Sequence, residues 1–172
     1  RKGQCGGMQN SLKVIAEVHA DWGRRFGRYH APLIESYCMD GADYAMLTIG
    51  SMTGAAKDAV DAARARGEKV GLLKVKTYRP FPAEALATAL AQVQAFGVVD
   101  RSVSFGWNCG PLYQDAITAM QYAPRRIAAM SFIGGLAGAD LTVSHFERVI
   151  GRVKELARDG RPADTVWLNE KD

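Results

Sequence analysis

Short apolar runs alternate with amphipathic segments over most of the chain. The apolar runs are residues 45–49, 70–75, 96–99 and 127–132. The amphipathic segments are residues 53–66, 82–93, 112–122 and 142–158. Short apolar runs predict buried strands, and apolar side chains repeated every three or four residues predict helices. The alternation therefore predicts an α/β fold, a three-layer α/β/α sandwich with a mostly parallel sheet.

The first 43 residues follow a different pattern. Apolar side chains at three-to-four spacing over residues 8–22 predict one amphipathic helix, which Gly23 and Gly27 end. Residues 28–43 mix proline, glycine and polar side chains without a steady period, so we expect an extended connector over the surface. The predicted organisation is an N-terminal helix and connector (1–43), one α/β domain (44–160) and a C-terminal tail (161–172).

Composition excludes several classes of protein. The chain has 172 residues, 48% hydrophobic and 23% charged, which suits one packed domain. Its net charge of +4 is mild and its basic residues are scattered, so we expect no nucleic acid partner. No apolar run approaches the roughly 20 residues that cross a bilayer, so we expect no membrane contact.

Three widely spaced cysteines form no C-x-x-C pair, so we expect a cytoplasmic protein without a local disulfide framework or a zinc or iron–sulfur cradle. The chain begins with Arg1, and a start inside a longer polypeptide is one explanation. Added residues or removal of an initiator Met are the others.

The carboxyl ends of parallel strands form the edge where such sheets meet ligands or partners. Four loops leave the predicted strands at this edge: residues 50–53, 77–80, 100–102 and 134–140. We therefore expect any function of the domain to gather there.

Gly50, Ser51 and Thr53 lie between a predicted strand and a predicted helix. Backbone amides and the positive helix end can hold a phosphate or a carboxylate at such a place. The spacing matches neither the dinucleotide-binding nor the P-loop motif, and a Ser or Thr that caps the helix explains it without a ligand. The cap is the favoured interpretation.

Two more loops carry candidate contact residues. In residues 134–140, glycines that include Gly135 and Gly138 precede Asp140 and permit close approach by a cofactor or another domain. Because this loop contains no Lys or Arg, packing against a domain is favoured over binding a diphosphate. Arg79 and Pro80 combine a guanidinium with a fixed turn, which suits a clamp onto a carboxylate of another domain or a rigid link between strand and helix.

No catalytic or metal-binding residue is predicted. The three histidines share no ligand spacing, and no Ser–His–acid or Cys–His set can be nominated. Residues 107–110 form a loop that can reach solvent, with Trp107 expected to be a packing anchor. Ser144 and Glu147 have the spacing of a capping box at the start of the last helix.

Four segments in this order resemble one known domain. They read GADYAMLTIGS, GEKVGLLKVKTYRPFP, VVDRSVSFGWNCGPLYQDA and GGLAGADLT. The resemblance is to the transketolase-C-terminal-like domain (domain II) in the alpha chain of pyruvate and related 2-oxoacid:ferredoxin oxidoreductases. It extends to the upstream connector FGRYHAPLIESYCMDGAD and covers roughly residues 22–158.

The resemblance implies an enzyme that converts a 2-oxoacid and coenzyme A to acyl-CoA, CO2 and reduced ferredoxin. Such enzymes use thiamine diphosphate, Mg²⁺ and iron–sulfur clusters, which other domains bind: a pyrimidine-binding, a diphosphate-binding and a cluster-binding part. These parts, and ferredoxin through the complex, are the expected partners. The present domain is implied to be a non-catalytic structural and assembly domain. In agreement, the chain has no G-D-G motif with a following Asn pair and no cysteine cluster.

Matched by position, the family motifs imply contact residues and no catalysts. These are Gly50 and Ser51 after the first strand, Arg79 to Pro82 after the second, Asp100 and Arg101 after the third, and Gly135, Gly138 and Asp140 in the last loop. Ala137 and Ala139 depart from the family pattern, which weakens the case for phosphate binding by the last loop.

Two alternatives remain open at this point. One is the C-terminal domain of a transketolase, a deoxyxylulose-phosphate synthase or a pyruvate dehydrogenase beta chain, which iron–sulfur absorbance of the native complex would exclude. The other is a stand-alone regulator that binds a small molecule or nucleotide at residues 50–53. Tight binding by the isolated chain would favour the regulator.

Overall fold

A six-stranded sheet organises the molecule in the computed structural model, which describes residues 1–161 and 164–170. The strands are β1 (Ile34–Tyr37), β2 (Tyr44–Ile49), β3 (Val70–Val75), β4 (Ala95–Asp100), β5 (Ala128–Ile133) and β6 (Val166–Trp167). Their order across the sheet is β1-β3-β2-β4-β5-β6. All neighbours run parallel except β1, which pairs with β3 in the antiparallel sense.

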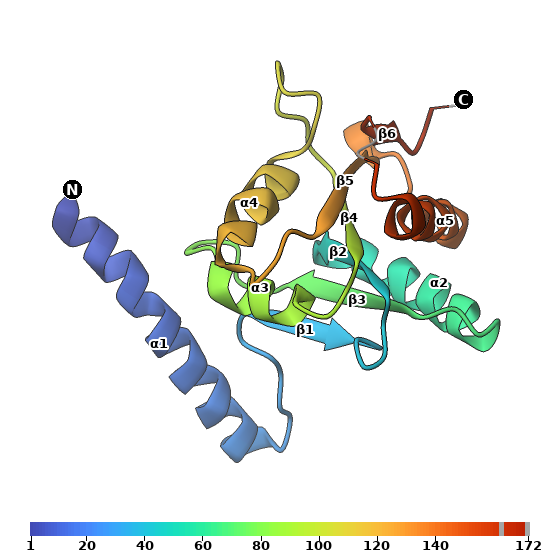
Figure 1. The fold of residues 1–172 in the computed structure, drawn as a ribbon. Helices are drawn as coiled ribbons and strands as arrows, with labels where there is room; N and C mark the ends of the chain where they lie inside the picture. The colour runs from blue at the N-terminus through green and yellow to red at the C-terminus, as the bar shows by residue number, and fades with distance from the viewer. Residues whose placement is uncertain (162–163, 171–172) are drawn as a thin grey trace.

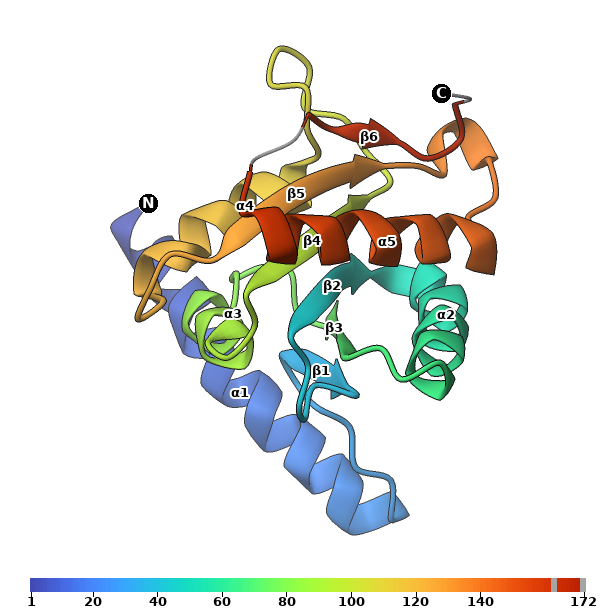
Figure 2. The same cartoon turned by 45° about the vertical axis from the view of Figure 1, so that its right-hand side comes forward.

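Helices cover both faces of the sheet (Figure 2). α2 (Thr53–Ala65) and α5 (Val143–Asp159) pack together over one face, and α3 (Ala83–Leu90) and α4 (Pro111–Ala119) over the other. Each face has its own apolar cluster, because side chains alternate between the two faces along each strand. Met46 and Phe132 lie under α2 and α5, whereas Leu47 and Phe96 lie under α3 and α4. The predicted three-layer α/β/α sandwich is confirmed.

Local signals explain where several helices begin and end. Gly67 follows α2 with a φ of +83°, as predicted for a residue that stops a helix. Pro111 opens α4, where its missing N–H costs no hydrogen bond. The predicted capping box of α5 is wrong by two residues: Thr142 precedes the helix, and its N–H donates to His145 Nδ1 at 3.0 Å. In a capping box, the side chain of the third residue after the cap accepts a hydrogen bond from the N–H of the cap residue. Here the cap is Thr142, so that third residue is His145.

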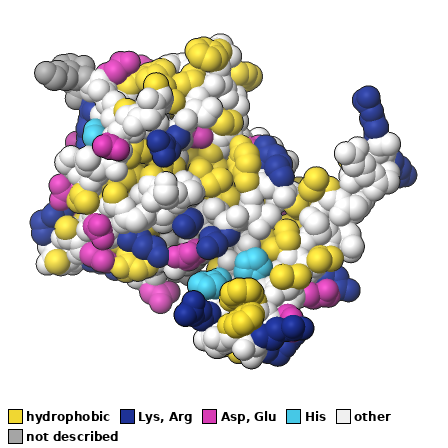
Figure 3. All heavy atoms as spheres, turned by 180° about the vertical axis from the view of Figure 1, so that it is seen from behind, with side chains coloured by type: hydrophobic (Ala, Val, Ile, Leu, Met, Phe, Trp, Pro, Cys, Tyr) yellow, Lys and Arg dark blue, Asp and Glu magenta, His cyan; other side chains and the backbone are white. Residues whose placement is uncertain are grey.

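α1 (Lys2–Phe26) stands apart from the three layers (Figure 1). It is longer than the predicted helix, since Gly23 lies within it and only Gly27, with a φ of +66°, ends it. Hydrophobic side chains are exposed along it, among them Val18 and Trp22, and Figure 3 shows such side chains on this part of the surface. No helix of the described residues has both the length and the apolar character to cross a bilayer.

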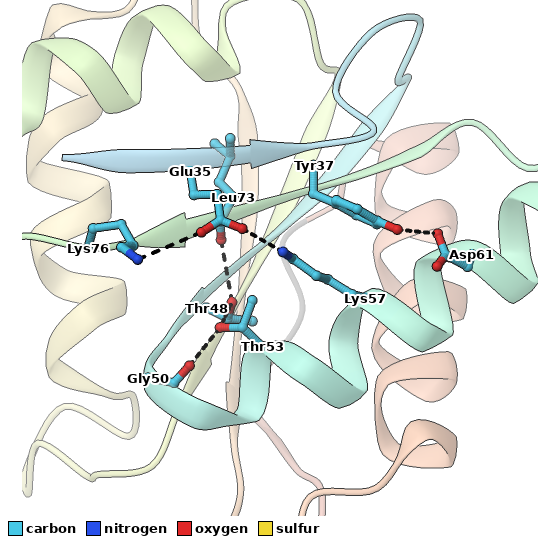
Figure 4. Close-up of polar contacts among 9 residues, drawn as sticks. All are labelled: Glu35, Tyr37, Thr48, Gly50, Thr53, Lys57, Asp61, Leu73 and Lys76. Carbon is cyan, nitrogen blue, oxygen red and sulfur yellow. Dashed lines mark hydrogen bonds and ion pairs between the residues drawn. The ribbon is translucent and has the colours of Figure 1, made fainter. Parts of the chain in front are cut away.

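The predicted connector contains an edge strand of the sheet, β1, which the sequence interpretation missed. Polar side chains fasten β1 to its neighbours (Figure 4). Glu35 accepts a hydrogen bond from Lys57 Nζ of α2 at 2.5 Å and lies 3.9 Å from Lys76 Nζ. The bond from Lys57 keeps the pKa of Glu35 below its usual value. Tyr37 donates its hydroxyl to Asp61 at 2.7 Å.

Two strands, β1 and β6, therefore come from outside residues 44–160 and complete the sheet. Neither strand carries a periodic signal, because β1 has four residues and β6 has two. The boundaries at 44 and 160 stay a prediction.

Candidate functional site

Three of the four predicted loops meet at the carboxyl edge of the sheet. Ser51 follows β2, Arg101 follows β4 and Asp140 follows β5, and all three line one hollow of about 190 Å³. Met52, Ala55, Ala139 and Leu141 complete its wall. The edge therefore brings together residues from distant parts of the sequence, as the parallel topology requires.

Arg101 connects two of these loops. Its Nε and Nη2 donate to the carbonyl oxygen of Gly135 at 3.3 and 3.2 Å. The side chain is exposed, and no carboxylate among the described residues forms an ion pair with it. A guanidinium carries five N–H donors, so Arg101 keeps donors for a carboxylate or carbonyl outside the chain.

The glycine-rich loop after β5 is held by a residue that the sequence interpretation missed. Asn169 accepts a hydrogen bond from Gly135 N–H at 2.7 Å and donates one to the Asp140 carbonyl at 3.0 Å. Gly135 has a φ of +72°, and a Cβ there would lie 2.7 Å from Arg101 Nε. Glycine is thus required both for the turn and for the approach of Arg101. Gly138, with a φ of +84°, has open space around it.

Thr53 has an internal role. It is buried, its hydroxyl donates to the Gly50 carbonyl at 2.9 Å, and it lies 3.0 Å from the hydroxyl of Thr48 (Figure 4). These bonds fix the turn that links β2 to α2. Ser51, in contrast, is exposed beside the hollow.

Asp100 is buried and faces the interior. Its two carboxylate oxygens accept hydrogen bonds from the amides of Leu112 and Tyr113, each at 3.0 Å, at the start of α4. Burial raises the pKa of Asp100 to about 6, although the two amide bonds favour the charged form. Gly110 makes this contact possible, because a Cβ there would lie 2.0 Å from Asp100 Cγ. Asp100 thus secures α4 to the sheet.

Arg79 and Pro80 lie apart from the hollow. The peptide between them is cis. Arg79 Nη2 binds Asp115 of α4 at 2.8 Å, and its guanidinium carbon lies 4.1 Å from the centre of the Tyr78 ring. The carboxylate that Arg79 was predicted to clamp therefore belongs to the same chain, and the contact ties the loop after β3 to α4.

The expectation for Trp107 is wrong. Its side chain is 75% exposed, in a loop between β4 and α4. A backbone bond from Ser104 N–H to the Cys109 carbonyl closes the loop around Trp107, and the indole packs in neither apolar cluster.

The described residues of this edge do not fit thiamine diphosphate or a metal centre. No group of three or more His, Cys, Asp or Glu side chains in residues 1–161 and 164–170 could hold a metal ion. The nearest buried carboxylate, Asp100, is already bonded to two amides. The three cysteines are free: Cys5 and Cys38 exposed, Cys109 buried.

Comparison with known proteins identifies the family. A model described as pyruvate:ferredoxin oxidoreductase core domain II matches residues 42–146. The chain belongs to this family. Among curated relatives of core domain II, the alpha subunit of NADH-dependent phenylglyoxylate dehydrogenase from Aromatoleum evansii is 58% identical over 100% of the chain and 42% of its own length.

Other relatives are more distant. The VorA subunit of ketoisovalerate oxidoreductase from Pyrococcus abyssi is 36% identical over 95% of the chain and 41% of its own length. The PorA subunit of pyruvate synthase from Methanosarcina barkeri is 33% identical over 96% of the chain and 41% of its own length. The chain thus spans about two fifths of the length of these alpha-type subunits.

Two solved structures share the fold of core domain II. One is 2-oxoglutarate:ferredoxin oxidoreductase from Magnetococcus marinus, with a TM-score of 0.53 and 23% identity over 80% of this chain and 21% of that chain. The other is a split-gene transketolase, an inactive beta4 tetramer. Its TM-score is 0.55, with 16% identity over 69% of this chain and 40% of that chain. The expected transketolase-C-terminal-like fold is confirmed.

Proposed function

We propose that this core domain II is a non-catalytic assembly domain in the alpha subunit of a 2-oxoacid oxidoreductase. The observation that carries the proposal is the match of residues 42–146 to core domain II. The geometry supports it: the predicted contact residues Asp100, Thr53 and Arg79 are engaged inside the chain, while Ser51, Arg101 and Asp140 surround an open hollow. The edge therefore offers polar groups to neighbouring domains or subunits, and its described residues include no reacting group.

The proposed reaction of the whole enzyme is oxidative decarboxylation of a 2-oxoacid, with transfer of the acyl group to coenzyme A. Thiamine diphosphate, Mg²⁺ and iron–sulfur clusters would be bound by other domains, and ferredoxin would accept the electrons, in a cytoplasmic complex. Phenylglyoxylate is the first substrate to test and NAD⁺ the first alternative acceptor, because the relative at 58% identity is named for that acid and for NADH.

Edge variants of the complete enzyme test the non-catalytic role. Arg101→Ala and Asp140→Asn are made in the full subunit, which is then produced with its partner subunits. We expect weaker association, seen by native mass spectrometry, with a kcat per assembled complex that stays within a few-fold of the original. Activity is measured with phenylglyoxylate, pyruvate and 2-oxoisovalerate, each with ferredoxin and with NAD⁺. A loss of kcat of about 100-fold or more in a fully assembled complex would place the edge in the catalytic machinery, as loss of a transition-state contact does.

A further inference from the structure

Large hydrophobic side chains are exposed in only two regions of the described chain. Six lie on α1 or just after it: Met8, Val14, Val18, Trp22, Phe26 and Tyr29. The other four lie in the loop after β4 or on and beyond α4: Phe105, Trp107, Ile117 and Tyr122. Phe105 and Trp107 are the most exposed of all, at 93% and 75%. A pair of nearly uncovered aromatic rings in one short loop is unusual for a surface that meets only water.

The loop that carries these rings is held in one shape. Ser104 N–H donates to the Cys109 carbonyl at 2.8 Å, and Trp107 N–H donates to the Ser104 carbonyl at 3.1 Å. At its base, Ser104 Oγ bonds Gln114 of α4 at 2.9 Å, and Thr165 donates to the Asn108 carbonyl. The loop projects beyond the three layers at the top of Figure 1. A fixed, projecting tip loses little conformational entropy on binding.

The composition of the loop indicates the chemistry of its partner. Residues 102–114 contain no charged side chain. Aromatic anchors without charge are typical of the centre of protein interfaces, where Trp and other large rings fill pockets on the partner. Membrane-surface segments combine such rings with Lys or Arg, which this run lacks. The composition therefore favours a protein pocket over a lipid surface.

The position of the loop agrees with this. It leaves β4 directly after Arg101, so it is continuous with the edge that carries Ser51 and Asp140. The relatives are themselves named as subunits, so neighbouring polypeptides are available as partners.

We propose that residues 104–109 form an anchor that inserts Phe105 and Trp107 into an uncharged apolar pocket on a different subunit of the oxidoreductase. The inference rests on the proposed function, because it names the contact by which this domain takes part in the assembly. Arg101 and Asp140 add polar contacts beside the anchor.

The test uses the full subunit and its partner subunits. The variant Phe105→Ser/Trp107→Ser removes both rings, and Tyr122→Ser, which removes another exposed ring, is the matched control. We expect the double variant to keep its circular dichroism spectrum and melting temperature, because neither ring stacks on another side chain in the described residues. Association with the partner subunits weakens by roughly 30-fold or more, as for loss of an interface hot spot, and the control associates normally. Equal association of the double variant and the control overturns the proposal.

Quenching of Trp107 provides a second measurement. In a subunit whose tryptophans other than Trp107, Trp22 and Trp167 among them, are replaced by Phe, Trp107 is incorporated as 5-hydroxytryptophan so that its emission is distinct from that of the partner subunits. We expect acrylamide to quench this indole in the free subunit and much less in the complex. An indole that stays equally accessible overturns the anchor even if association has changed for another reason.

Two further outcomes would also overturn it. If the double variant abolishes self-association of the subunit alone, the partner is a second copy. If it abolishes binding to phosphatidylserine vesicles and leaves subunit association intact, the partner is a lipid surface. The proposed function fails separately, when the unaltered subunit binds no partner subunit at all.

Discussion

Asp100 shows how a residue at the edge can serve the interior. It ends β4 within a motif that predicts a contact surface, yet its carboxylate binds the first amides of α4. A carboxylate at the N-terminus of a helix satisfies amides that have no partner within the helix. Asp100 and Arg101 thus have different roles at neighbouring positions: Asp100 secures α4, and Arg101, in the wall of the hollow, bonds the loop after β5.

The raised pKa of Asp100 predicts a pH dependence of stability. The carboxyl has its ordinary pKa of 3.8 in the unfolded chain and a pKa of about 6 in the folded chain. The folded state therefore binds a proton that the unfolded state has lost, so this contribution is full below pH 3.8 and is lost as pH rises through 6. Asp100→Asn cannot titrate. We expect the stability of the original relative to this variant to fall by about 2–3 kcal/mol between pH 4 and 7 in urea denaturation. A pH-independent difference would contradict the burial of this group.

Gly110 makes a second prediction at the scale of one residue. A methyl group at this position would overlap Asp100 and push α4 from the sheet. We expect Gly110→Ala to lower the free energy of unfolding by about 2–3 kcal/mol, the usual cost of overpacking. Gly54→Ala is the control, since Gly54 lies exposed in α2 with nothing within 4 Å of an added Cβ. That variant gains up to about 1 kcal/mol from helix propensity. Changes of equal size and sign in the two variants would contradict the overlap with Asp100.

At the scale of elements, the buried strands and helices were predictable and the edges of the sheet were not. The run at 70–75 coincides with β3, and the ends of the other central strands differ from the prediction by at most one residue. β1 was missed because none of its four side chains is fully buried and its register depends on β3, 35 to 41 residues away. The spacing of apolar residues along the chain does not show with which distant strand a segment pairs.

The candidate site was also predictable only in part: the sheet topology predicts which loops share an edge, but not which contacts their side chains make. Parallel topology alone predicts that Ser51, Arg101 and Asp140 share one edge, where the structure brings them together. It could not tell that Asp100 faces inward, that Arg79 has a partner in α4, or that Asn169 holds the last loop. These contacts join residues that lie far apart in sequence, and side-chain direction decides them.

The attachment of β1 to α2 can be tested through Lys57. Its Nζ lies 2.5 Å from Glu35 and 4.9 Å from the centre of the Tyr37 ring, so one side chain contacts two residues of β1. Lys57→Met keeps most of the apolar stem and removes the charge. We expect a loss of about 0.5–1 kcal/mol, because solvent partly screens the pair. Hydrogen exchange should quicken in residues 34–37, whereas Lys13→Met, which breaks the exposed pair with Glu17, leaves those amides unchanged.

At the scale of the whole molecule, contacts within the chain hold the helices and loops of the sandwich in place, and the carboxyl edge of the sheet remains exposed to partners. Asn169 holds the loop after β5 beside the hollow, and Arg79 ties the loop after β3 to Asp115 of α4, so internal contacts hold both loops in place. A preformed edge of this kind suits docking, because the partner meets groups that are already fixed.

The final prediction follows from the contents of that edge. A thiamine diphosphate site needs oxygen ligands for a divalent cation and room for the whole cofactor. The hollow has about 190 Å³, and no group of metal ligands lies among the described residues. In titration calorimetry with Mg²⁺ present, we expect no saturable heat when thiamine diphosphate is added to the isolated chain. The complete oxidoreductase, stripped of cofactor, serves as the control and should bind it. Stoichiometric binding by the isolated chain would contradict the prediction. Loss of that binding in Arg101→Ala would then place the cofactor site at this edge.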